Sequence, residues 1–266
     1  MLGPQHKEVY LERRMTMRLS VCMDAVYSKL DFAQSVKEVK QIGYDTIEFW
    51  SWWNKDLDEV ARVVKTTGVS VAAFCTKFVS LVDETMRETY LVGLAESIEA
   101  AKRLNCSQLI SQVGQELEGV SREAQRQSIV DGLKACVPLL EREGITLLVE
   151  PLNTLVNHQG YFLASSEEAF DLVKQVGSQH VKVLFDIYHQ QITEGHLITN
   201  IRENITWIGH FHAAGNPGRH ELSNGELNYE QIFKAIDETG FTGYIGLEYF
   251  PLEEPSVGLK RLINDK

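Results

Sequence analysis

From Arg18 onward, short apolar runs alternate with longer segments in which apolar residues recur every three or four positions. The short runs are rich in β-branched and aromatic residues and predict buried strands, whereas the longer segments predict amphipathic helices. Eight strands are predicted, at residues 19–23, 46–49, 69–75, 108–112, 146–150, 181–186, 207–212 and 244–248. Eight helices are predicted after them, at residues 32–42, 57–66, 84–104, 122–143, 166–176, 197–203, 229–238 and 255–262.

This strict alternation is typical of repeated βα units around a parallel sheet. Several helices carry end signals, because a glycine in the left-handed conformation ends a helix at little cost; these glycines are Gly43, Gly68, Gly144, Gly177 and Gly240. Ser165 and Glu168 offer a capping-box start to the helix at 166–176. The sequence therefore predicts an α/β protein with a closed (β/α)8 barrel. An open doubly wound sheet is the alternative, but no GxGxxG turn follows the first strand.

The domain organisation follows from length and from the absence of linkers. The chain has 266 residues, and one (β/α)8 barrel takes about 250. No Pro-rich or Gly-rich segment divides it. We expect a single barrel domain over residues 18–266, preceded by an N-terminal extension over residues 1–17 that contains Met15 and Met17.

Composition narrows the classes of partner. The formal net charge is −11, which repels a nucleic-acid backbone in the absence of a local basic patch. The four cysteines lack zinc-like spacing, so buried reduced thiols are expected at Cys22, Cys75, Cys106 and Cys136. No apolar run reaches about 18 residues, and no secretory signal begins the chain. We expect a cytoplasmic protein without nucleic-acid or membrane partners.

Ionisable residues end four consecutive predicted strands: Glu150, Asp186, His212 and Glu248. Active sites of (β/α)8 barrels lie where the strands end, so these side chains are expected to converge. A single acid at a strand end is often only a helix cap or an ion-pair partner. Four together repel one another unless a cation is present. Three carboxylates and an imidazole suit one divalent metal ion such as Mn²⁺, Mg²⁺ or Co²⁺.

Three segments carry a resemblance to a known family. They read Val-Glu-Pro-Leu-Asn at 149–153, Phe-Asp-Ile-Tyr-His-Gln-Gln at 185–191, and Gly-Asn-Pro-Gly-Arg-His-Glu followed by Gly-Glu-Leu-Asn-Tyr within 215–229. They resemble the hydroxypyruvate isomerase family, which belongs to the xylose-isomerase-like barrels together with the tagatose and psicose 3-epimerases. The resemblance spans residues 18–261, and the segment at 215–229 is its most specific part.

The resemblance implies roles for particular residues. The metal ligands would be Glu150, Asp186, His212 and Glu248, with Glu150 and Glu248 also acting as the acid–base pair. His189 and Arg219 match positions that contact substrate oxygens. Two departures from the family pattern bear on the substrate. At the position of His212 the hydroxypyruvate isomerases often carry Gln, whereas the 3-epimerases carry His. Leu155 and Val156 stand where family members tend to have an Arg-Asp-like pair.

Other interpretations of these residues stay open in the sequence. His189 is also placed to cap a helix start, and Arg219 to pair with Glu221 or Glu226. The tryptophans at 50–53 fit either a pocket wall or packing over the barrel mouth. His210 shares the strand face of His212 one layer deeper, which indicates a structural role.

The expected function is metal-dependent isomerisation of a small hydroxy-carbonyl substrate, such as hydroxypyruvate or a related oxo acid, through an enediolate. A ketose 3-epimerase is the nearest alternative. An endonuclease of the same superfamily would need more histidines and a basic groove, and a non-catalytic sugar-binding barrel would show a broken ligand set. By analogy with the family, the partner is a small molecule and the protein is a homo-oligomer.

Overall fold

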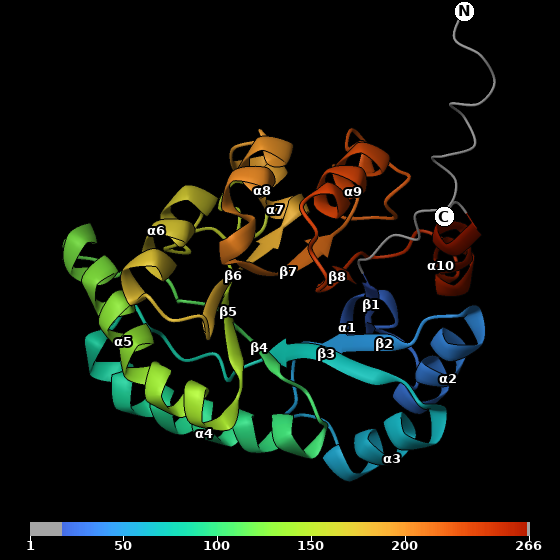
Figure 1. Cartoon of the computed structure of the whole chain (residues 1–266), viewed down its shortest axis with the longest axis horizontal. Coiled ribbons are helices and arrows are strands. Elements are labelled where there is room, and N and C mark those ends of the chain that lie inside the picture. The colour runs from blue at the N-terminus through green and yellow to red at the C-terminus, as the bar shows by residue number, and fades with distance from the viewer. Residues whose placement is uncertain (1–17, 265–266) are drawn as a thin grey trace, which may run out of the picture.

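A closed ring of eight parallel strands in chain order forms the centre of the molecule. The structure is a computed structural model that describes residues 18–264. Helices surround the ring in Figure 1, as expected for a sheet whose strands are apolar on both faces. The single-barrel prediction is confirmed. The strands are β1 (Arg18–Cys22), β2 (Thr46–Phe49), β3 (Ser70–Cys75), β4 (Gln108–Ser111), β5 (Thr146–Val149), β6 (Val181–Asp186), β7 (Ile208–Ala213) and β8 (Tyr244–Leu247).

The outer helices begin and end at the residues that local chemistry favours. Ser165 Oγ accepts from the Glu167 amide at the start of α6, and Gly144 ends α5 at φ +66°. The helices are α1 (Met23–Val26), α2 (Phe32–Ile42), α3 (Leu57–Thr67), α4 (Arg87–Arg103), α5 (Arg122–Glu143), α6 (Ser166–Val176), α7 (Ile187–Thr193), α8 (Leu197–Asn204), α9 (Tyr229–Glu238) and α10 (Pro255–Asn264), with short 3-10 turns η2 (Glu84–Met86) and η3 (Ile205–Trp207).

The structure corrects several predicted boundaries. Most strand ends differ by one residue, so Glu150 and Glu248 lie just beyond their strands. The helix predicted at 84–104 is a 3-10 turn followed by α4, because Asp83 caps the turn by accepting from the Thr85 amide. Helices α1 and α7 were not predicted as separate elements, since four and seven residues are too few to show a helical period.

Two kinds of side chain fill the barrel interior. A small apolar cluster comes from β3 to β6 and packs against Trp50, with Ala73, Cys75, Ile110, Leu148 and Leu184 as its members. On the side of β1, β2 and β7 the buried interior is polar instead. All four cysteines are buried free thiols, as expected. The predicted N-terminal extension lies outside the described residues, and within 18–264 no helix combines the length and apolar character needed to cross a membrane.

Candidate functional site

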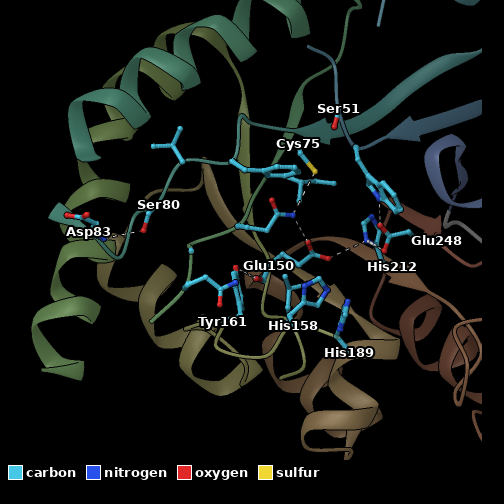
Figure 2. A pocket seen from close by; sticks show the side chains of 18 of the residues that line it. Ser51, Cys75, Ser80, Asp83, Glu150, His158, Tyr161, His189, His212 and Glu248 are labelled. Carbon is cyan, nitrogen blue, oxygen red and sulfur yellow. Dashed lines mark hydrogen bonds and ion pairs between the residues drawn. The ribbon is translucent and has the colours of Figure 1, made fainter. Parts of the chain in front are cut away.

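The four strand-end residues meet in one buried cluster. Glu150 and Glu248 follow β5 and β8 directly, Asp186 ends β6, and His212 lies near the end of β7. One ligand atom from each lies within 4.8 Å of the others. Figure 2 shows Glu150, His212 and Glu248 pointing toward one another from different strands. The predicted convergence at the C-terminal end of the barrel is therefore confirmed.

His212 is at the centre of the cluster. Its Nδ1 lies 3.1 Å from Glu248 Oε2, 3.5 Å from Glu150 Oε1 and 3.9 Å from Asp186 Oδ2. Neither ring nitrogen has a hydrogen-bond partner of good geometry within the described structure. A buried polar atom left unpaired in this way is rare and calls for an explanation. Here the unpaired nitrogen faces three carboxylates, which is the arrangement of a ligand set around a common centre.

Neighbouring donors distinguish the two glutamates. Glu248 Oε1 accepts from the Trp50 indole at 2.5 Å, and its Oε2 accepts from the Arg219 guanidinium. Glu150 accepts from one neutral donor, the Gln112 amide, at 3.2 Å. More lone pairs of Glu150 are therefore free to take a proton. The sequence offered Trp50 as a pocket wall but revealed neither its hydrogen bond to Glu248 nor the contribution of Gln112, because the two residues follow β2 and β4, which are remote from the acids along the chain.

Burial and close charges act in opposite directions on the titration of the cluster. Burial raises the pKa of Asp186, and Glu248 adds to this effect. Burial would also raise the pKa of Glu248, but Arg219 and then His212 hold it well below its ordinary value. For His212 burial favours the neutral ring, yet Glu248 and Glu48 raise its pKa well above the ordinary value. Negative charge thus dominates the centre of the site.

His189 and Arg219 both lie beside this cluster. His189 is buried in the first turn of α7, where its backbone amide donates to Asp186 Oδ1 at 3.1 Å. The cap of that helix is thus Asp186, and the alternative in which the His189 side chain forms the cap is wrong. Burial, followed by Arg219, lowers the pKa of His189 to about 3, so the ring is neutral near pH 7.

Arg219 makes different ion pairs from those weighed in the sequence. Its Nη2 pairs with Glu248 and lies 3.6 Å from Asp186 Oδ2. The described part of the chain shows no ion pair from Arg219 to Glu221 or Glu226, so that alternative is wrong. Arg219 holds φ at +58°, an uncommon backbone conformation for a residue other than glycine. The loop at 215–226 thus directs this guanidinium to the carboxylates.

A second polar layer, not predicted from the sequence, lies next to the cluster. Glu48 from β2 is buried, its Oε2 accepting from Ser20 Oγ at 2.6 Å and lying 3.0 Å from His210 Nε2. Its Oε1 lies 2.9 Å from His212 Nε2. Gly246 makes this possible, since a Cβ there would stand 2.2 Å from Glu48 Oε1. The structural role predicted for His210 agrees with this contact.

A cavity of about 720 Å³ opens from the cluster. In Figure 2 it extends from Glu248 and His212 toward Ser80 and Asp83, between the segments that follow β3 and β4. Trp50 lines it, whereas Trp53 stacks edge-on against the exposed Phe78 with ring centres 5.1 Å apart. Both sequence interpretations of the tryptophans thus hold for different residues. Of the described residues that line the cavity, Arg219 is the one arginine or lysine.

Comparison with known proteins agrees with this architecture. A family model described as "Xylose isomerase-like TIM barrel" matches residues 36–264, which is most of the chain. This chain belongs to that family. Several similar proteins match over nearly their whole length. Hydroxypyruvate isomerase of Escherichia coli is 28% identical to this chain, over 92% of this chain and 97% of its own length. A putative hydroxypyruvate isomerase of Danio rerio is 31% identical over 87% and 89%.

Other similar proteins carry different names. The 2-oxo-tetronate isomerase of Cupriavidus necator is 40% identical, over 50% of this chain and 51% of its own length. The named relatives place this chain among isomerase enzymes. A crystal structure from Brucella melitensis titled "AP endonuclease, family 2" superposes with a TM-score of 0.89 at 27% identity, over 93% of this chain and 98% of that one.

Proposed function

We propose that this protein is a metal-dependent isomerase that moves a carbonyl group along a small hydroxy-oxo acid, such as hydroxypyruvate or 2-oxo-tetronate. The observation that carries the proposal is the buried group of Glu150, Asp186, His212 and Glu248, whose ligand atoms lie within 4.8 Å of one another. The similarity to hydroxypyruvate isomerase and 2-oxo-tetronate isomerase supports the choice of substrate class.

The residues of the cluster fit one divalent metal ion. Three carboxylates and one imidazole form a donor set for Mn²⁺, Mg²⁺ or Co²⁺, and the unpaired His212 Nδ1 faces the acids. Buried carboxylates this close together repel one another without a counter-charge, and Arg219 with the protonated His212 ring offsets only two of their three negative charges. Such an ion, when bound, polarises the substrate carbonyl and lowers the free energy of the enediolate.

Glu150 and Glu248 are proposed to move the proton. A base removes the proton from the hydroxyl-bearing carbon beside the carbonyl, and the C–H electron pair becomes the double bond of the enediolate. A proton returned to the former carbonyl carbon, together with transfer of the hydroxyl proton to the former carbonyl oxygen, completes the isomerisation, so no external oxidant or reductant is needed. Glu150, with its single neutral donor from Gln112, is the better placed of the two to take the proton.

His189 and Arg219 are proposed to orient the substrate. His189 Nε2 has no hydrogen-bond partner within the described structure, and the ring lines the cavity. It is placed to donate to a substrate oxygen. Arg219 would attract the substrate carboxylate, since a guanidinium recognises carboxylates through paired N–H donors, while its contact with Glu248 holds that glutamate in place.

The decisive experiment follows hydrogen exchange by NMR in D₂O with Mn²⁺ present. Purified enzyme is incubated with hydroxypyruvate, with 2-oxo-tetronate and with a panel of free ketoses. Exchange at the hydroxyl-bearing carbon of the oxo acids, together with formation of the isomeric aldehyde or ketone, is the expected result. Absence of exchange with every substrate in the panel would reject the proposed function.

A ketose 3-epimerase is the second candidate. His212 is the ligand that the 3-epimerases share, and a cavity of about 720 Å³ has room for a six-carbon sugar. Exchange confined to C3 of a ketose would assign the protein to this activity. The name of the Brucella structure suggests an endonuclease. The charge of this chain does not support that activity, because a net charge of −11 repels the phosphate backbone of a nucleic acid.

Replacing Arg219 by Gln tests the recognition of the substrate carboxylate. We expect kcat/KM for hydroxypyruvate to fall about 10- to 100-fold more than kcat/KM for dihydroxyacetone, which has the same carbon skeleton without the acid. This range corresponds to the roughly 1.5–3 kcal/mol of a charged hydrogen bond. Loss of the Glu248 contact affects both substrates, so only the ratio reports recognition. An unchanged ratio would assign Arg219 to positioning Glu248 alone.

Replacing Glu48 by Gln tests the polar layer beside the cluster. Partners that orient a metal-ligating histidine typically contribute 10- to 100-fold in metal affinity, so we expect Mn²⁺ to bind about 10-fold more weakly in calorimetry. Glu221→Gln is the matched control, because Glu221 is also a buried acid but accepts from the Leu252 amide away from the cluster. Equal Mn²⁺ affinity in Glu48→Gln and the wild type would remove Glu48 from the site.

A further inference from the structure

The His189 ring has one fully occupied nitrogen and one unpaired nitrogen. Nδ1 lies 3.2 Å from the backbone nitrogen of Asn153 and 2.6 Å from its side-chain Nδ2. Nε2 has no hydrogen-bond partner in the described structure and lies 3.6 Å from Asp186 Oδ2, beyond hydrogen-bond length. His189 and Asn153 are both completely buried. The protein groups in contact with Nδ1 therefore decide which nitrogen carries the proton.

Asn153 determines the position of that proton. Its backbone amide can only donate. Its side-chain amide is held in one orientation, because Oδ1 accepts from the backbone amides of Val156 at 3.0 Å and Asn157 at 3.2 Å. The nitrogen end consequently faces His189 and also donates to Asn157 Oδ1 at 3.0 Å. Two N–H donors point at Nδ1, so Nδ1 must offer its lone pair.

We propose that Asn153 is a positioning residue that locks His189 in its neutral tautomer with the proton on Nε2. A ring whose Nδ1 accepts cannot be the doubly protonated cation, and its Nε2–H can only donate. His189 is thereby a donor to a substrate oxygen that gains negative charge during enolisation, and it is not the base. The tautomer assignment is independent of the proposed function. The role of His189 as a donor to the substrate rests on the proposed function.

Nitrogen NMR of the 266-residue chain tests the tautomer directly. In ¹⁵N-histidine-labelled protein without metal, the signals of His189 are assigned by their loss in His189→Gln. We expect wild-type His189 to show a protonated Nε2 and an unprotonated Nδ1. In Asn153→Asp an acceptor replaces the amide donor, so the neutral ring is expected to move its proton from Nε2 to Nδ1. Observation of Nδ1–H in the wild type, or of an unchanged ring in Asn153→Asp, would overturn the proposal.

Asn157→Asp is the matched control for the added charge. The Asn157 side chain accepts hydrogen bonds from Asn153 and from the Tyr188 hydroxyl. Within residues 18–264 it makes no hydrogen bond with the His189 ring, so an aspartate there keeps both acceptor roles. We expect its His189 spectrum to match the wild type. If Asn153→Asp does not fold, the wild-type spectrum alone decides.

Kinetics separate a donor role from a merely structural one. Losing one preorganised donor to a developing negative charge costs roughly 10²–10³-fold in kcat, so Asn153→Asp is expected to lower kcat about 100-fold with KM nearly unchanged. A rise in KM at constant kcat would overturn the donor role. The expected tautomer in a protein inactive on every substrate would reject the proposed function and leave the tautomer assignment standing.

Discussion

Glu150→Gln is expected to lower kcat for hydroxy-oxo acid isomerisation by roughly 10²–10⁴-fold, the range typical of general acid–base groups. The amide preserves the size of the side chain and can still accept from Gln112, but it cannot take a proton. The measurement is exchange of the substrate C–H in D₂O at saturating Mn²⁺, which reports proton removal directly. Glu248→Gln should also lose activity, and it additionally leaves the Trp50 and Arg219 donors without their anion.

The control for Glu150→Gln is Glu116→Gln. Glu116 pairs with Arg122 and its side chain is 53% exposed, so this change removes one negative charge outside the cluster. We expect its exchange rate to equal that of the wild type within about twofold. If Glu150→Gln also exchanges the substrate proton at the wild-type rate, Glu150 is not the base, and Glu248 becomes the candidate for that role.

Removal of divalent metal is expected to abolish turnover and to lower thermal stability. Without a divalent cation the carboxylates of Glu150, Asp186 and Glu248 repel one another in a buried site. A metal ion at a free concentration 100 times its dissociation constant stabilises the folded protein by about 2.7 kcal/mol. Activity assays and calorimetry of chelator-treated protein, before and after titration with Mn²⁺, Co²⁺ or Mg²⁺, measure the two effects. Ca²⁺, which requires longer bonds and more ligands, serves as the comparison ion.

The protonation state of His212 makes metal binding dependent on pH. The pKa of His212 lies well above its ordinary value in the metal-free protein, so the ring is protonated near pH 7 and must lose its proton to ligate. Mn²⁺ binding is therefore expected to release a proton and to weaken as the pH falls. Calorimetry in two buffers of different ionisation enthalpy measures that release. Activity that survives thorough chelation would contradict the metal-dependent mechanism.

The sequence was sufficient to predict the barrel and the four residues of the cluster, because both follow from periodic patterns. Strands and helices repeat along the chain, and the ionisable residues mark strand ends at equivalent positions. Parallel strands in a closed ring place those ends together regardless of the exact register. An error of one residue at a strand end, as at Glu150, did not alter that conclusion.

The residues that surround the cluster could not be predicted, because their contacts depend on three-dimensional details that no local sequence pattern contains. Glu48 lies inside a short apolar strand, and its only sequence signal is an acid among buried neighbours. Its contact with His212 reaches from β2 to β7 past β1 and β8, and it depends on Gly246 in β8 leaving space. Trp50 reaches Glu248 across 198 positions in the chain. Asn153 orients its amide through loop amides whose geometry appears only in three dimensions.

The reacting groups and part of the cavity wall come from different strands of the ring. Glu150, Asp186, His212 and Glu248 follow or end β5 to β8, whereas Ser80 and Leu117 belong to the segments after β3 and β4. Mutations in those two segments can alter which molecules enter while the proton-transfer apparatus stays intact. Substrate specificity can therefore change by substitutions that leave the four cluster residues in place, which is a route to differently named enzymes on one kind of barrel.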